Sequence, residues 1–280
     1  MNLRSLFPFL SITFGLTWGL AAILILFPDQ MVAMFGELSM TNPLFILAVY
    51  APAFAAFALV VYHHGARGLG KFLSRLLLWR CHPAWYAFIV AGIPILMLSG
   101  AALKGKLGKE AFPFDPWYQM FPALAVALVI GPIEEFGWRG LALPLLQRRF
   151  APLWAALILG AIWGVWHIPA FLLGGTPQSS WSFVPFFLAT ISISVVMTAL
   201  LNASGGSLLL VALIHFQLNS PLYPPSDPYD SFMITLAAVI VIVLNRKTML
   251  SRNGSVTDVV PLSAVAAIDR APLSELGRDR

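Results

Sequence analysis

Eight stretches of this chain are almost continuously apolar, and they restrict the possible folds more than any other feature. Most are close to the ~20 residues that a helix needs to cross ~30 Å of hydrocarbon. A bilayer offers the backbone no hydrogen-bond partners, so such segments must be helical. They cover roughly residues 6–28, 43–62, 84–103, 117–147, 153–172, 183–201, 207–223 and 229–244. We therefore predict an all-α polytopic membrane protein with about eight transmembrane helices.

The overall composition agrees with a membrane protein. Hydrophobic residues make up 59% of the 280 residues and charged residues only 10%, whereas about 25% of the residues in soluble domains are charged. The single cysteine, Cys81, excludes an intramolecular disulfide and any metal site built from several cysteines. No phosphate-binding glycine loop and no HExxH motif is present. We expect a lipid bilayer as the environment and no nucleic acid as a partner.

The positive charges are distributed unevenly between the loops. If the N-terminus lies inside, the outer loops carry only Lys104, Lys106 and Lys109. The inner segments then carry the remaining basic residues of the loops and of the start of the tail: Arg4, Arg67, Lys71, Arg75, Arg80, Arg148, Arg149, Arg246, Lys247 and Arg252. Cytoplasmic loops of membrane proteins are enriched in Lys and Arg. This asymmetry predicts an integral protein of a plasma (inner) membrane, with both termini in the cytoplasm.

The chain divides into two parts. Residues 1–244 form the predicted membrane domain, and its second half, 117–222, contains the unusual polar residues. Residues 245–280 are polar and are predicted to form a mostly disordered cytoplasmic tail.

Six residues stand out among the polar residues in the apolar segments of the second half. They are Glu134, Glu135, Arg139, His167, His215 and Asn219. A charged side chain at the bilayer centre costs ~2.5–3.5 kcal/mol on insertion scales, so such residues indicate a functional site. The alternative is a polar network that only joins helices. Two glutamates and two histidines from three separate helices favour a site.

The spacing of these residues predicts how they meet. Glu134 precedes the centre of the QRRFAPL turn by about 16 residues and His167 follows it by about 16, so antiparallel helices place both at one depth. The segment 117–147 is too long for one straight crossing, and Gly131-Pro132 is the expected kink. Glu135 and Arg139, four residues apart, can form an ion pair. Neighbouring Glu134 then points elsewhere, and we expect it to share one cavity with His167, His215 and Asn219.

Three motifs follow one another in this region: Glu-Glu-x-x-x-Arg in EEFGWR, aromatic-x-x-x-His in WGVWH and His-x-x-x-Asn in HFQLN. Their order and spacing resemble the CAAX prenyl protease and bacteriocin-processing (CPBP, or Abi) family of intramembrane endopeptidases. The resemblance covers roughly residues 117–222. One departure is Trp163, where phenylalanine is the more usual aromatic residue. We interpret this change as one of pocket shape rather than of chemistry.

The resemblance implies a peptidase that acts on a protein or peptide substrate at the membrane. Glu134 would be the general base, and His167 would orient the attacking water or share its proton. His215 and Asn219 would stabilise the oxyanion of the tetrahedral intermediate, at ~2.7–4 kcal/mol for one such donor. Glu135 and Arg139 would form the supporting ion pair.

A metal-free reaction without any cofactor is the favoured prediction. Members of the family have been described both as glutamate-dependent proteases and as metalloproteases. Glu134, His167 and His215 could supply a zinc site with one open position. However, no HExxH pair lies on one helix, and a zinc site would leave Asn219 alone to hold the oxyanion. Zinc is therefore the alternative.

Two other classes of protein use residues of the same types. A transporter also places Glu, His and Arg inside the membrane, but it is expected to show repeated halves with paired broken helices. Here we find no internal repeat, and the unusual polar residues all lie between positions 134 and 219. A non-catalytic membrane scaffold is the second alternative.

Overall fold

The computed structural model describes residues 1–109 and 112–261, and these residues form helices and connections without any strand. The predicted all-α fold is confirmed. The helices are α1 (Leu6–Leu26), α2 (Pro28–Phe35), α3 (Pro43–Leu73), α4 (Pro83–Ala87), α5 (Ile93–Leu103), α6 (Met120–Ile130), α7 (Glu135–Gly137), α8 (Leu143–Gln147), α9 (Pro152–Trp166), α10 (Ile168–Leu172), α11 (Phe183–Ala203), α12 (Leu208–Leu218), α13 (Tyr229–Leu244) and α14 (Arg246–Met249).

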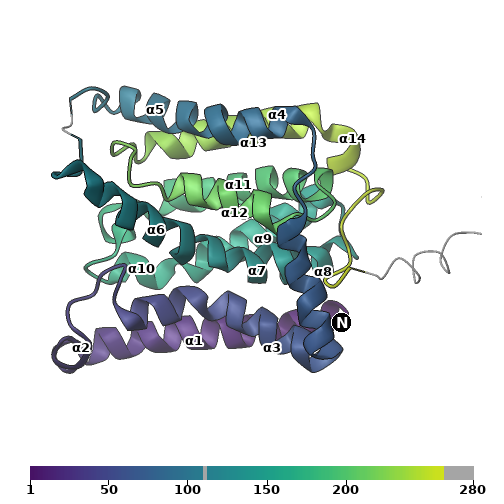
Figure 1. Cartoon of the computed structure of the whole chain (residues 1–280), viewed down its shortest axis with the longest axis horizontal. Coiled ribbons are helices and arrows are strands. Elements are labelled where there is room, and N and C mark those ends of the chain that lie inside the picture. The colour runs from purple at the N-terminus through teal and green to yellow at the C-terminus, as the bar shows by residue number, and fades with distance from the viewer. Residues whose placement is uncertain (110–111, 262–280) are drawn as a thin grey trace, which may run out of the picture.

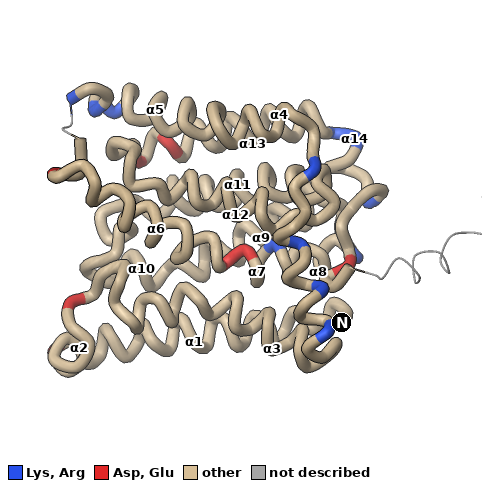
Figure 2. The backbone as a smooth tube through the Cα atoms, in the orientation of Figure 1, with Lys and Arg blue, Asp and Glu red and all other residues tan. Residues whose placement is uncertain are grey.

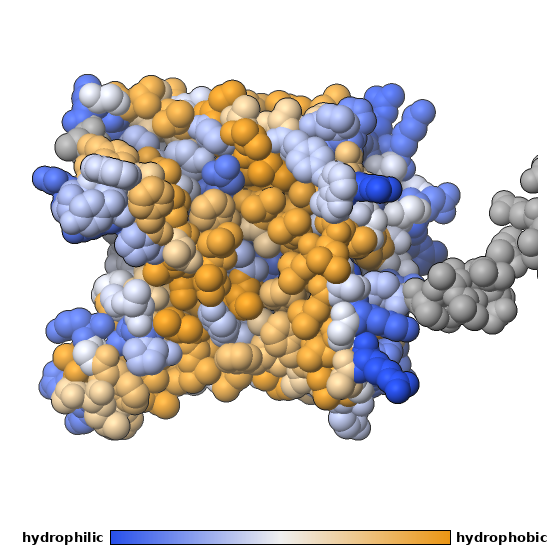
Figure 3. Space-filling model, in the orientation of Figure 1, coloured by the Kyte–Doolittle hydropathy of each residue, from blue (hydrophilic) through white to orange (hydrophobic). Residues whose placement is uncertain are grey.

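Helix length and outer surface both identify an integral membrane protein. Six helical stretches of the described residues are long and apolar enough to cross a membrane, and α12 and α13 are shorter apolar helices. Together they account for the eight predicted segments. Figure 3 shows a broad hydrophobic band across the middle of the molecule and hydrophilic residues at both ends. Phe7, Val90 and Leu244 are among many exposed large hydrophobic residues, at 78%, 70% and 76%, and so extensive an apolar surface indicates contact with lipid.

The long helices run side by side between the two ends of the molecule (Figure 1). The main packing pairs are α1 with α3, α9 with α11, α11 with α13, and α13 with α5. Small residues allow the closest approach: a Cβ at Gly160 of α9 would lie 2.6 Å from Ile191 Cα of α11. In a bilayer such close contacts replace the hydrophobic effect as the force between helices. In the second half of the chain, α11 packs against α9, α12 and α13 and so lies at the centre of the helices.

The segment 117–147 is broken, as predicted, at Gly131-Pro132. Helix α6 ends at Ile130, and a 3₁₀ turn follows at Pro132–Glu134. After the short α7, a π-helical turn occupies Trp138–Ala142 before α8 begins. Proline lacks the N–H that would continue the helix, and π turns are frequent at functional sites. The irregular backbone therefore coincides with the glutamates singled out in the sequence.

Charge divides the molecule into two ends. Figure 2 shows Lys and Arg gathered at the end that carries the N-terminus, α8 and α14, which we call the basic end. Asp and Glu outnumber the basic residues at the opposite end. This end contains Asp29, Glu37, Asp115, Asp227 and Asp230 beside Lys104, Lys106 and Lys109. The uneven distribution of charge along the sequence thus corresponds to two opposite ends of the molecule.

Residues 245–261 are folded, in contrast to the predicted disordered tail. Gln147 Nε2 donates to the carbonyl oxygen of Val256 at 2.9 Å, and Val259 is 2% exposed. The guanidinium of Arg75, itself 1% exposed, donates to the carbonyl oxygens of Gly140, Gly206 and Val259. Val259 in the core and Val260 packed against it are apolar residues that the polar composition of the tail conceals. The remainder of the predicted tail, 262–280, lies outside the described residues.

Candidate active site

The two adjacent glutamates face different partners. Glu134 ends the 3₁₀ turn and accepts a hydrogen bond at Oε2 from the indole Nε1 of Trp163, at 2.9 Å. Glu135 begins α7 and turns toward Arg139 and His215. Both glutamates are buried, at 4% and 1% exposure. The predicted division of roles between them therefore has a geometric basis.

Glu135 connects Arg139 to His215. Its Oε1 accepts from Arg139 Nη1 at 3.1 Å, which is the predicted ion pair, and lies 2.6 Å from His215 Nδ1. An ionised carboxylate only accepts hydrogen bonds, so the proton of the second contact belongs to His215 Nδ1. The other ring nitrogen, Nε2, is then left for the cavity. No sequence motif reveals this contact, because it joins residues 80 positions apart.

Trp163 links the remaining charged groups. The centre of the Arg139 guanidinium lies 4.3 Å from the centroid of the Trp163 ring, in a cation–π contact. The edge of the same ring donates to Glu134. The interpretation of Trp163 as a change of shape alone is therefore incomplete, because phenylalanine has no N–H to donate. The motif spacing located this residue but could not reveal its partner.

His167 lies at the end of α9, where its ring is held in one orientation. Its Nδ1 lies 2.8 Å from the carbonyl oxygen of Trp163, one turn earlier. Because a carbonyl oxygen only accepts, Nδ1 is the donor, and Nε2 is an acceptor in the neutral ring. The ring also packs edge-on against Trp166 and Phe186. Backbone and aromatic contacts thus orient Nε2 before any substrate binds.

Asn219 and His215 approach the broken segment at Gly131. A Cβ built on Gly131 would lie 1.9 Å from Asn219 Nδ2 and 2.8 Å from His215 Nε2. Any larger residue at this position would displace one or both of these side chains. Gly131 is therefore part of the predicted kink and also opens space for two predicted site residues.

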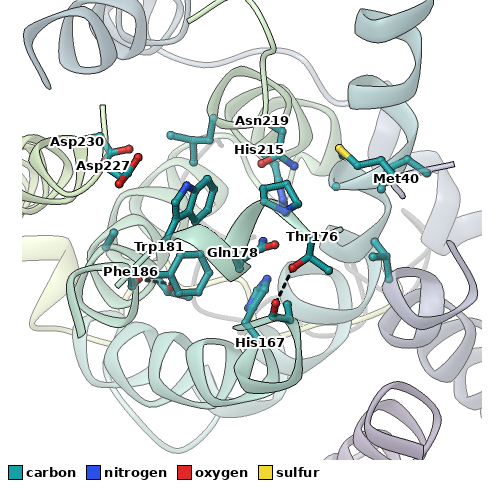
Figure 4. Close-up of a pocket in the computed structure, with 18 of the residues that line it drawn as sticks. Met40, His167, Thr176, Gln178, Trp181, Phe186, His215, Asn219, Asp227 and Asp230 are labelled. Carbon is teal, nitrogen blue, oxygen red and sulfur yellow. Dashed lines mark hydrogen bonds between the residues drawn. The ribbon is translucent and has the colours of Figure 1, made fainter. Parts of the chain in front are cut away.

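All four predicted site residues line one cavity of about 550 Å³. Glu134, His167, His215 and Asn219 contribute to its wall, and Glu135 and Arg139 lie behind the wall. Figure 4 looks into the cavity and shows both histidines facing the same space, with Asn219 next to His215. Its volume is in the range of small-molecule binding sites. The arrangement brings a carboxylate, an imidazole acceptor and two possible donors to one accessible space.

The zinc alternative places a specific demand on the positions of three side chains. Such a site needs Glu134, His167 and His215 to converge on one point. Within residues 1–109 and 112–261, no group of three His, Cys, Asp or Glu side chains has an arrangement that could hold a metal ion. One Glu134 oxygen is also engaged by Trp163.

The fold and the site define a class of protein: all-helical integral membrane proteins in which a buried carboxylate and two histidines line one cavity. Comparison with known proteins points to the family. Residues 116–220 match the family described as Type II CAAX prenyl endopeptidase Rce1-like. A protein of Methanococcus maripaludis named CAAX prenyl protease 2 is 23% identical over 185 residues, which are 61% of this chain and 68% of that protein. The resemblance inferred from the three motifs is confirmed, and the matches support a protease.

Proposed function

We propose that this protein is an intramembrane endopeptidase that hydrolyses a peptide bond of a membrane-associated protein or peptide. The observation that carries the proposal is the meeting of Glu134, His167, His215 and Asn219 at one cavity. The family match adds the class of reaction. The Trp163 hydrogen bond holds the Glu134 carboxylate in place, and a carboxylate so held can accept a proton from water.

The geometry supports a hydrolysis in which water attacks the scissile carbonyl carbon. Glu134 takes one proton of this water, and Nε2 of His167 accepts a hydrogen bond from the other O–H. Asn219 Nδ2 donates to the oxyanion that forms, and so does Nε2 of His215 when its ring is an imidazolium paired with Glu135. Collapse of the intermediate breaks the C–N bond, and Glu134 returns its proton to the leaving amine.

The direct test is cleavage of a peptide library by the purified protein, read by mass spectrometry, beside a Glu134→Ala variant. We expect cleavage by the wild type, none by the variant, and no effect of a zinc chelator. Loss of activity on chelation, restored by zinc, would overturn the metal-free reaction. Absence of cleavage by the wild type would favour the scaffold or transporter.

We also propose that the basic end is cytoplasmic, with both termini inside a plasma (inner) membrane. The N-terminus and the end of α13 lie together at that end, and the α5–α6 connection lies at the other (Figure 1). Reporter fusions after residue 115 and after residue 245 should therefore report outside and inside, respectively, as the positive-inside rule requires. The same side for both fusions would contradict this topology.

Asn219→Ala should lower kcat while leaving residual activity. The change deletes one donor to the oxyanion, and losses of about 10²–10³-fold are typical for such a deletion. Asn219 is exposed at the end of α12, so the melting temperature should stay close to that of the wild type. Unchanged kcat would remove Asn219 from the mechanism.

Trp163→Phe should lower kcat with little change in KM. The variant keeps an aromatic ring at the site but loses the N–H that holds Glu134. A hydrogen bond to a charged group contributes ~1.5–3 kcal/mol, so we expect a loss of roughly 10- to 100-fold. Trp166→Phe is the matched control, because the indole N–H of Trp166 donates to Thr17 Oγ1 and not to a carboxylate. Equal losses of kcat in both variants would indicate packing alone.

A further inference from the structure

The cavity opens at one end of the molecule. Most of its lining is buried or half-buried, and Glu134 and His215 lie deep inside at 4% and 5% exposure. Its exposed lining residues all lie in one of two connections, 173–182 between α10 and α11 or 219–228 between α12 and α13. They form what we call the mouth: Pro177, Trp181, Ser182, Asn219 and Pro225.

The mouth lies at the end opposite the basic end. Asp227 and Asp230 belong to the cavity lining on that side, and Asp227 pairs with Lys104 at 2.9 Å. The loops 29–42, 173–182 and 224–228 contain no Lys or Arg. In Figure 2, most Lys and Arg residues lie at the opposite end of the molecule from the mouth. By the positive-inside rule the mouth therefore faces the non-cytoplasmic side.

The basic end is closed by protein, which is an independent observation. Arg75 joins the carbonyl oxygens of Gly140, Gly206 and Val259, so the broken segment, the start of α12 and residues 245–261 are tied together. Trp138 of the broken segment is fully buried and packs edge-on against Phe9 and Trp166. No residue of 245–261 lines the cavity. A peptide arriving from the basic end would have to unfold this closure.

We propose that the substrate enters from the non-cytoplasmic side, so that the substrate class is a peptide segment exposed at the outer surface of the membrane. The extracellular end of a membrane-anchored protein is such a segment. A chain end in the cytoplasm cannot reach the mouth. The choice of substrate class rests on the proposed peptidase function. The direction of the opening does not depend on it and is measured separately.

Cysteine accessibility in intact cells tests the direction. The chain has one cysteine, the free Cys81 of the α3–α4 connection, and Cys81→Ser gives a cysteine-free background. Two matched changes then place a thiol at either end: Ser182→Cys at the mouth and Ser74→Cys at the exposed basic end. The Ser182 side chain makes no capping hydrogen bond to α11, so the folded structure should tolerate the change.

A membrane-impermeant maleimide should label Ser182→Cys in intact cells and label Ser74→Cys only after permeabilisation. The reverse pattern, labelling of both before permeabilisation, or labelling of neither would overturn the proposed direction. This readout needs no activity, so it stands even if the peptidase proposal fails.

Substrate entry is tested with sealed right-side-out and inside-out vesicles and a charged fluorogenic peptide library. Cleavage should occur in right-side-out vesicles and should require detergent in inside-out vesicles. A bulky maleimide on Ser182→Cys should reduce cleavage at least tenfold, and the same label on Ser74→Cys should not. Cleavage confined to inside-out vesicles would overturn outer entry while leaving the peptidase intact. Absence of cleavage in every preparation, with Ser182→Cys labelled from outside, would reject the peptidase and the substrate class but not the direction.

Discussion

Glu134→Gln should abolish most peptide cleavage while leaving the protein folded. The amide has nearly the shape of the carboxylate, and its carbonyl oxygen can still accept from Trp163 Nε1. What it cannot do is take a proton from water. General-base catalysis contributes about 10²–10⁴-fold, so kcat should fall by at least that range. The measurement is kcat on a cleaved peptide, together with the melting temperature in detergent.

Glu37→Gln is the matched control for this prediction. It makes the same chemical change at an exposed residue of the α2–α3 connection that does not line the site cavity. Both the melting temperature and kcat of this variant should match those of the wild type. Full activity in Glu134→Gln would reject the mechanism proposed here. A large drop in its melting temperature would instead identify Glu134 as a packing residue.

Glu135→Ala and Arg139→Ala should each lower stability as well as activity. Their side chains are 2% and 0% exposed and form an ion pair at 3.1 Å. Breaking a buried pair leaves the partner charge uncompensated, which costs ~3–5 kcal/mol. Activity should fall further in Glu135→Ala, because His215 Nδ1 loses its acceptor. The free energy of unfolding in mild detergent and kcat at a temperature where both variants are folded are the quantities to compare.

Two comparisons make the stability prediction specific. Lys104→Ala breaks an ion pair whose side chains are 26% and 34% exposed, and such pairs contribute only ~0–1 kcal/mol. The double variant Glu135→Ala/Arg139→Ala should be less destabilised than the sum of the single variants, since neither charge is left alone. Additive losses, or a loss in Lys104→Ala as large as in Arg139→Ala, would contradict a buried ion pair that contributes to stability.

The sequence alone determined those features that depend on local pattern. Long apolar runs must be helical in lipid, so the eight segments could be located without any tertiary information. Glu135 and Arg139 are four residues apart on one helix, so their pairing followed from helix geometry. Counting residues on either side of the α8–α9 turn placed Glu134 and His167 at one depth, because antiparallel helices share the same rise per residue.

The tertiary structure decided everything that depends on contacts between separate helices. The Trp163 N–H reaches Glu134 across 29 positions, Glu135 meets His215 across 80, and Gly131 makes room for Asn219. The packing of residues 245–261 and the burial of Arg75 also require the assembled helices, because their partners are backbone carbonyls that no motif encodes. Helix period and hydropathy specify which face is apolar, but the neighbour that covers that face is set only when the helices pack.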